Sequence, residues 1–97
     1  MNDAEAIALA LEEAKSAAAR GEVPVGAVLL SADGALLARD GNRILELKDP
    51  TAHAEMLVLR AGAKVLNNER LIGAGIGLIT AREVLQLGFP GFSPGWF

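Results

Sequence analysis

The sequence contains no cysteine and no tyrosine, and its only histidine is His53. Without cysteine, this chain can form neither a disulfide scaffold nor a thiolate-ligated metal site. Phenylalanine and tryptophan are also few, and all four fall within the last nine positions: Phe89, Phe92, Trp96 and Phe97. We therefore expect the core of the preceding residues to be built from Ala, Val, Ile, Leu and Met alone.

Charge and length exclude further classes. The formal net charge is −3, so the chain has no general basic surface of the kind that binds nucleic acid. No apolar run approaches the roughly 20 residues of a membrane span, and the acidic residues 1–5 do not resemble the basic start of a signal peptide. With 97 residues, 52% of them hydrophobic, we expect one small globular domain in the cytoplasm.

The first elements are a helix and a hairpin. A helical repeat predicts a helix over residues 3–20, capped by Asn2 with Glu5 and ended by Gly21. We expect it to bury the face formed by Ile7, Leu11, Ala14 and Ala18. The continuous apolar run 23–30 predicts a strand buried on both faces, and residues 35–39 predict its hairpin partner after an Asp33-Gly34 turn. Residues 44–49 show no periodicity and predict a loop.

A second helix is predicted to begin at Pro50-Thr51 and to end at Asn67-Asn68. Its predicted buried stripe is Met56, Leu59, Ala63 and Leu66. Beyond it, residues 73–80 suggest a glycine-weakened strand and residues 81–87 a short helix, whereas 88–97 carry turn residues throughout and predict no element.

His53 and Glu55 stand at the start of this second helix. A lone histidine there is often a capping or surface residue, but a neutral imidazole is also the commonest nitrogen ligand of zinc. Side chains at positions i and i+2 point about 200° apart around a helix axis, so both can address one ligand only from beyond the helix end. A site formed by this pair would therefore use the helix N-terminus.

Three segments, in order and spacing, resemble a known family. They are Glu22-Val-Pro-Val-Gly-Ala-Val28, Gly41-Asn42-Arg43 and Asp49-Pro-Thr-Ala-His-Ala-Glu55. Together they resemble the N-terminal part of bacterial tRNA adenosine deaminases, members of the zinc-dependent cytidine deaminase-like superfamily with its His-x-Glu…Pro-Cys-x-x-Cys signature. The resemblance runs from the first helix to about residue 72.

The resemblance implies an α/β fold, a cytidine deaminase-like α-β-α layered sheet that is incomplete at the C-terminus. It implies hydrolytic conversion of adenosine to inosine at the wobble position of tRNA, with zinc as cofactor, the anticodon loop as partner and a homodimeric assembly. By resemblance, His53 is the metal ligand, Glu55 the catalytic carboxylate that shuttles protons, and Asn42 the residue that holds the substrate. An ordinary left-handed turn residue after Gly41 is the alternative for Asn42.

The chain departs from the family where the two cysteine ligands belong. The corresponding place holds Glu83 and Gln86, which have the right i, i+3 spacing, but glutamine is a poor zinc ligand and the adjacent Arg82 opposes a cation. We therefore divide the chain into a deaminase-like part, 1–72, and a divergent tail, 73–97. We expect the chain as written to be truncated relative to the family and unable to hold catalytic zinc.

Several explanations of the tail and of the function remain open. A frameshift, a miscalled coding end or a diverged short paralogue would each produce such a join; a Pro-Cys-x-x-Cys in another reading frame would indicate the frameshift. The alternative functions are a non-catalytic partner or binding subunit of an intact deaminase, and a relative of guanine or cytosine deaminases. A small sheet with one uncovered edge also predicts marginal stability.

Overall fold

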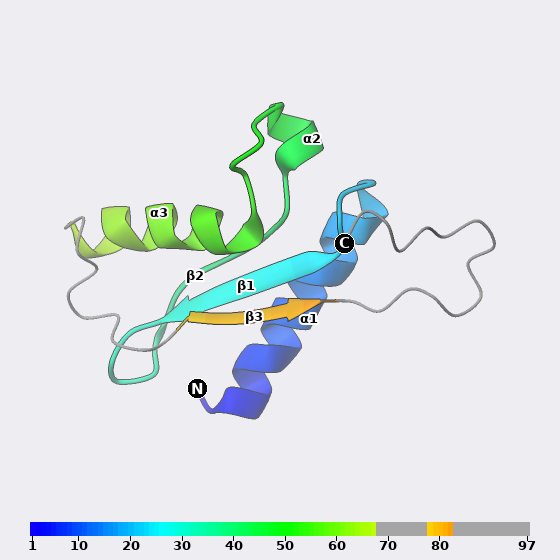
Figure 1. The fold of residues 1–97 in the computed structure, drawn as a ribbon. Helices are drawn as coiled ribbons and strands as arrows, with labels where there is room; N and C mark the ends of the chain where they lie inside the picture. Colours follow the sequence, from blue (N-terminus) through cyan, green and yellow to red (C-terminus); the bar gives the residue numbers. More distant parts are fainter. Residues whose placement is uncertain (68–77, 83–97) are drawn as a thin grey trace.

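The computed structural model describes residues 1–67 and 78–82 (Figure 1). The described elements follow in the order α1 (Asp3–Ala19), β1 (Val25–Leu30), β2 (Leu36–Gly41), α2 (Ile44–Leu47), α3 (Ala54–Leu66) and β3 (Leu78–Arg82). None of the helices in these ranges is long and apolar enough to cross a bilayer.

The strands form an antiparallel sheet in the order β2-β1-β3. The predicted hairpin is confirmed: Gly26 of β1 pairs with Gly41 of β2, and the register shifts once, between Leu29 and Leu30. β1 lies between the other two strands, and a helix covers each face of the sheet, so five of the six β1 residues are buried. This central position accounts for the apolar run without polar alternation.

The two helix layers each contact one set of alternating β1 side chains. Ala27 and Leu29 pack against α3, in a cluster with Ala54 and Val58. Val28 and Leu30 point the other way and pack against Ala6 and Ala10 of α1. The α-β-α layering expected from the sequence is therefore confirmed for the described residues, with α1 on one face of the sheet and α3 on the other (Figure 1).

Helix α1 has the predicted ends but a different buried face. The Asn2 side chain accepts from the Glu5 amide and the Glu5 carboxylate from the Asn2 amide, forming a capping box, and Gly21 has the left-handed φ of +83°. The buried residues are all alanines: Ala6, Ala10, Ala14 and Ala17. Of the face predicted from the repeat, only Ala14 is fully buried; Ile7 is 45% exposed, and Leu11 and Ala18 are partly exposed.

The alanine face follows from two glycines of the sheet. A Cβ on Gly26 would overlap the carbonyl oxygen of Ala10, and one on Gly41 would lie 2.5 Å from the carbonyl oxygen of Glu13. Since Gly26 and Gly41 are paired across the hairpin, they open a flat area on which the α1 backbone rests. At this separation only side chains as small as alanine fit between helix and sheet, so the larger Ile7 is turned outward.

Residues 44–49, predicted to be a loop, contain the single helical turn α2. Its N-cap residue, Arg43, makes no side-chain capping bond, and it ends at Lys48 with a left-handed φ of 51°. The first amides are instead bound by a carboxylate distant in sequence: Glu22 accepts from Leu45 N (3.0 Å) and from Glu46 N (2.8 Å). This long-range cap explains why the local pattern carries no helix signal.

Helix α3 begins at Ala54 rather than at Pro50-Thr51, and ends at Asn67 as predicted, with a left-handed φ of 56°. Its buried residues are Ala54, Val58 and Gly62, whereas Met56 of the predicted stripe is 37% exposed. Three other members of that stripe are partly buried, and Leu59 and Leu66 pack against the core. Anchoring of Ala54 on the sheet fixes the rotation of the helix, so the positions four and eight residues later face inward.

Strand β3 corrects the prediction for residues 81–87. Ala81 pairs with Gly26 and Arg82 with Val25, so both residues continue a strand instead of beginning a helix. Residues 78–80 of the predicted strand belong to β3. The remainder of both predictions, and residues 88–97, lie outside the described residues.

Candidate active site at the N-terminus of α3

A tight turn leads the chain into α3. The Asp49 carboxylate accepts from the Thr51 backbone amide (2.8 Å) and from the Thr51 hydroxyl (2.7 Å), and the Asp49 carbonyl accepts from Ala52 N. The Thr51 backbone amide, then its hydroxyl, hold the pKa of Asp49 below its usual value, and Arg60 contributes at 3.9 Å. These bonds bend residues 49–52 away from helical geometry and delay the helix start to Ala54.

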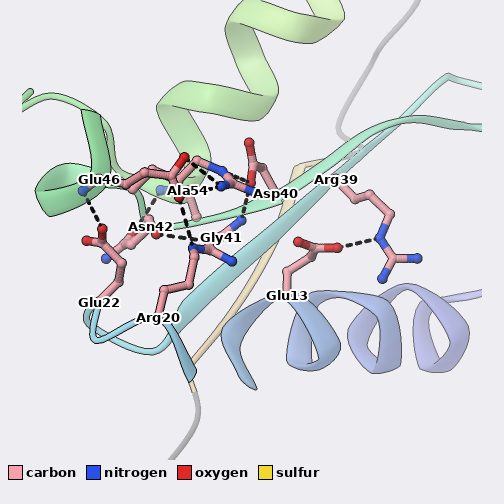
Figure 2. A network of polar contacts seen from close by, with 10 residues as sticks. Glu13, Arg20, Glu22, Arg39, Asp40, Gly41, Asn42, Glu46 and Ala54 are labelled. Atoms are coloured by element: carbon pink, nitrogen blue, oxygen red, sulfur yellow. Dashed lines mark hydrogen bonds and ion pairs between the residues drawn. The ribbon is translucent and has the colours of Figure 1, made fainter. Parts of the chain in front are cut away.

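Asn42 connects the end of β2 to the start of α3. Its side chain is buried, at 3% exposure, and Oδ1 accepts from the Ala54 backbone amide at 2.7 Å (Figure 2). The backbone amide of Asn42 donates to Val25 O at 3.0 Å. The left-handed residues among those described are Lys48, Asn67, Gly21 and Gly34, so the turn-residue alternative for Asn42 is wrong.

His53 and Glu55 flank the amide that Asn42 binds. His53 is the N-cap residue of α3, exposed and in extended conformation, but its imidazole makes no capping bond. Glu55 lies in the first turn and is partly buried. Asn42 takes over the capping that His53 would otherwise provide, which leaves the imidazole without a structural hydrogen bond in the described part of the chain. The structure therefore gathers the three sequence-predicted residues at one helix end.

The donors at this helix end do not fit a complete zinc site. Catalytic zinc takes three protein ligands, and the family supplies one histidine and two cysteines. Here the cysteine count is zero, and residues 1–67 and 78–82 hold no group of three or more His, Asp or Glu side chains able to bind a metal ion. Glu83 and Gln86, which occupy the place of the two cysteines, lie outside the described residues. One nitrogen donor, His53, is what the described residues offer.

A polar network that the sequence pattern did not predict lies behind Asn42 (Figure 2). Arg20 donates to the Asn42 carbonyl oxygen at 3.1 Å, and its Nε lies 3.6 Å from the Glu46 carboxylate. Arg43 binds Asp40 through Nε (2.8 Å) and Glu46 through Nη1 (2.8 Å). The hydrogen bond to Asp40, followed by its charge and that of Glu46, raises the pKa of the Arg43 guanidinium. A charged residue beside an apolar strand, as Glu22 is, would have been the available signal for this network.

An open, mostly apolar cavity of about 390 Å³ adjoins this network. It is lined by the α1–β1 connection and the start of α2: Gly21, Glu22, Val23, Ile44 and Leu45. The Glu22 carboxylate, which belongs to the α1–β1 connection, accepts hydrogen bonds from the backbone amides of α2. These bonds connect the two walls of the cavity at its polar end.

Comparisons with known proteins identify the family of the chain. The sequence model of the cytidine and deoxycytidylate deaminase zinc-binding region matches residues 1–81. The tRNA-specific adenosine deaminase of Agrobacterium fabrum is 56% identical over 68 residues, an alignment that covers 70% of this chain and 44% of that protein.

Two solved structures are also similar. One, from a study of A-to-I editing by tRNA:A34 deaminases at the wobble position of transfer RNA, has a TM-score of 0.70 and 48% identity, over 79% of this chain and 52% of the other. Guanine deaminase from Bacillus subtilis has a TM-score of 0.64 and 36% identity, over 70% and 43%. The chain thus spans about half the length of these relatives. It belongs to the cytidine and deoxycytidylate deaminase family, and its resemblance to the tRNA adenosine deaminases is confirmed.

Proposed function

We propose that this chain carries the substrate-holding and proton-moving residues of a cytoplasmic, zinc-dependent deaminase that converts adenosine to inosine at the wobble position of tRNA. One observation carries the proposal: the bond from Ala54 N to Asn42 Oδ1, which joins Asn42 to the helix end that bears His53 and Glu55. The relatives named as tRNA-specific adenosine deaminases support the substrate class. The anticodon loop would be the bound partner, and a second copy of the chain the expected assembly.

Each residue has a role that its position permits. Since Oδ1 of Asn42 is occupied by Ala54 N, its Nδ2 is the group left to donate to a substrate oxygen. Glu55 lies in the first turn of α3, and we assign it the transfer of protons to the base and to the departing ammonia. His53 offers one nitrogen to a metal ion, which in the family activates the attacking water. Because the donors present do not fit a complete zinc site, the roles of this chain are to hold the substrate and to move protons.

A chimera tests the proposal. Residues 1–72 of this chain replace the matching segment of the Agrobacterium deaminase, which then contributes the rest of its own chain. We expect the chimera to convert adenosine to inosine in an anticodon stem-loop, and Glu55→Gln to lower the rate by at least about a hundredfold. Glu12→Gln, an exposed carboxylate of α1, is the matched control and should leave the rate unchanged. A folded, zinc-loaded chimera without activity would contradict the proposal.

The similarity to a guanine deaminase structure supports a second candidate, a deaminase of free bases. The same chimera, supplied with guanine or cytosine in place of RNA, distinguishes the two. Faster turnover of the free base than of the stem-loop would favour the second candidate.

Absence of cysteine supports a third candidate, a non-catalytic subunit that pairs with an intact deaminase. Co-purification of this chain with a full-length deaminase from the same cells would favour it. A chain that shifts neither tRNA nor a deaminase in gel filtration would exclude it.

Zinc content tests the ligand argument directly. We expect the purified chain, after dialysis against a weak chelator, to retain less than about 0.1 zinc per chain by atomic absorption, because one imidazole cannot replace three ligands. His53→Ala should not change this value. Stoichiometric zinc would mean that further ligands come from residues outside the described ranges.

A further inference from the structure

Arg20 is the C-cap residue of α1, and its side chain reaches Asn42 at the end of β2. Its Nη2 donates to the Asn42 carbonyl oxygen at 3.1 Å. Its Nε is buried without a hydrogen bond and faces the Glu46 carboxylate at 3.6 Å. The guanidinium therefore lies between a main-chain carbonyl and a carboxylate, as Figure 2 shows.

Three of the four polar groups of Asn42 are engaged. The backbone amide donates to Val25 O, the carbonyl accepts from Arg20, and Oδ1 accepts from Ala54 N. Because Ala54 N is a donor, the oxygen and not the nitrogen of the side-chain amide must face it. In the described part of the chain, no residue accepts a hydrogen bond from Nδ2. The direction of Nδ2 is therefore determined by the bonds of the other three groups, which hold the backbone and Oδ1 of Asn42 in place.

The partner of Arg20 is itself fixed. The Glu46 carboxylate also binds Arg43, at 2.8 and 3.0 Å, and the Glu46 backbone amide is bound by the buried carboxylate of Glu22. Glu22 is only 6% exposed, so this bond is shielded from water. Glu46 consequently presents its charge to Arg20 from a defined place.

We propose that Arg20 is a positioning residue of the candidate site: by fixing the Asn42 carbonyl, it sets the direction of Nδ2 toward substrate. This inference rests on the proposed function for the identity of Asn42 as the substrate-holding residue. Arg20 is bound to the main chain of Asn42, so it acts through Asn42.

A matched arginine separates positioning from general stabilisation. Arg39 of β2 also pairs with carboxylates, those of Glu12 (2.9 Å) and Glu13 (2.7 Å) of α1, but it makes no bond to Asn42 (Figure 2). Arg39 makes the shorter ion pairs, so its removal deletes at least as much ionic contact as the removal of Arg20, whose pair with Glu46 spans 3.6 Å. A difference between the two variants at the start of α3 therefore reports the bond to Asn42.

The test is amide hydrogen exchange in the full chain, measured by NMR. Ala54 N, in the first turn of α3, is bound by Asn42 Oδ1, so its protection reports that bond. In Arg20→Met we expect Ala54 N to exchange about tenfold faster, the loss typical of one charge-assisted hydrogen bond. Leu57 N, bound to His53 O in the same helix, should change less than twofold, as should both amides in Arg39→Met.

Arg20→Lys is the conservative variant, since an ammonium can donate to the same carbonyl without the planar fork. It should bring Ala54 exchange to within about threefold of the parent. Unchanged Ala54 exchange in Arg20→Met, or equal acceleration at Leu57 or in Arg39→Met, would overturn the inference.

Titration with adenosine completes the experiment and keeps the two proposals apart. If the parent binds adenosine, Arg20→Met should weaken the apparent Kd about tenfold and Arg39→Met should not. A parent that binds no adenosine would count against the proposed function, while the exchange data would still support or overturn the positioning by Arg20. Adenosine binding that is equally strong in the parent and in Arg20→Met would overturn the positioning inference.

Discussion

The two polar atoms of the buried Asn42 side chain have different roles. Oδ1 accepts a hydrogen bond from the first backbone amide of α3, whereas the two N–H groups of Nδ2 are left to donate to substrate. The bond to Ala54 crosses twelve positions of the chain, so no local pattern could predict it. The sequence therefore left a substrate-holding residue and a left-handed turn residue as equal alternatives, and the backbone geometry excludes the second.

Two substitutions at this residue separate its structural role from its binding role. Asn42→Ala leaves the buried Ala54 amide unpaired, so we expect it to lower the free energy of unfolding by about 1–3 kcal/mol. Asn42→Asp keeps an acceptor for that amide at a helix N-terminus and should cost less. Both remove the Nδ2 donors and should weaken adenosine binding, measured by titration alongside urea unfolding. Equal affinities in Asn42→Asp and the parent would contradict the assignment.

The contacts of Arg20, Glu22 and Glu46 could not be predicted from the sequence. The resemblance named Glu22 as part of a matching segment, but its partners are the amides of residues 45 and 46. Arg20 and Glu46 meet only because the α1–β1 connection and α2 pack together. Such contacts depend on tertiary placement, which composition and periodicity do not contain.

In the packing of α1 on the sheet, removal of a large side chain should cost less stability than addition of one methyl group. Ile7→Ala deletes a large side chain that the helical repeat assigned to the core, yet Ile7 is 45% exposed, so we expect a loss below about 1 kcal/mol. Gly26→Ala adds one methyl group against the Ala10 carbonyl and should cost about 1–3 kcal/mol, because α1 must move off the sheet. Urea denaturation measures both. A larger loss for Ile7→Ala than for Gly26→Ala would refute this packing.

The turn before α3 predicts an acid-sensitive element. Bonds from Thr51 lower the pKa of Asp49 in the folded state below its value in the unfolded chain. Its contribution to stability is therefore fully present above the unfolded pKa of about 3.9 and is lost as the pH falls through the folded pKa. We expect Asp49→Asn to be less stable than the parent at pH 6, with the gap closing toward pH 2.

Thr51→Ala provides the control for this acid dependence, because it removes the hydroxyl bond but keeps the backbone one. In the Thr51→Ala background, the Asp49→Asn substitution should cost less stability than it does in the parent, but not zero. Urea unfolding at several pH values measures this difference. A gap between Asp49→Asn and the parent that stays constant from pH 6 to pH 2 would contradict the predicted titration.

Element types were predicted better than their faces and starts. Binary pattern identified α1, β1, β2 and α3, because each has a strong period or an unbroken apolar run. The pattern could not reveal that Gly26 and Gly41 bring α1 close enough to exclude Ile7, or that an Asp49–Thr51 turn would delay α3 to Ala54. The helical turn α2 was missed because its cap lies at Glu22.

At the scale of the whole molecule, we predict marginal stability. A 97-residue chain buries a modest core, and its α1 layer consists of alanines, which remove little apolar surface from water per residue. We expect a midpoint of thermal unfolding below about 60 °C. Circular dichroism, recorded at two scan rates, measures this midpoint. A cooperative transition well above that temperature would show that the core is larger than the described residues indicate.

The fold class and the membership of the family could be predicted from the whole sequence, and the completeness of the site could not. Three ordered segments were enough to identify the relatives, and they also placed Asn42, His53 and Glu55 at one helix end, which the structure brings together. Their roles stay predictions. The boundary near residue 72 also stays a prediction, although the family match continues to residue 81 and β3 pairs with β1.

The strand order β2-β1-β3 has a consequence for synthesis on the ribosome. β1 can pair with β2 as soon as the hairpin has emerged, but its other edge has to wait for β3, about fifty residues later. At translation rates of roughly 5–20 residues per second, that edge stays unpaired for several seconds while its apolar residues are already exposed. During this interval a nascent β1 is open to pairing with another chain, so slow translation of the segment between α3 and β3 should favour aggregation over folding.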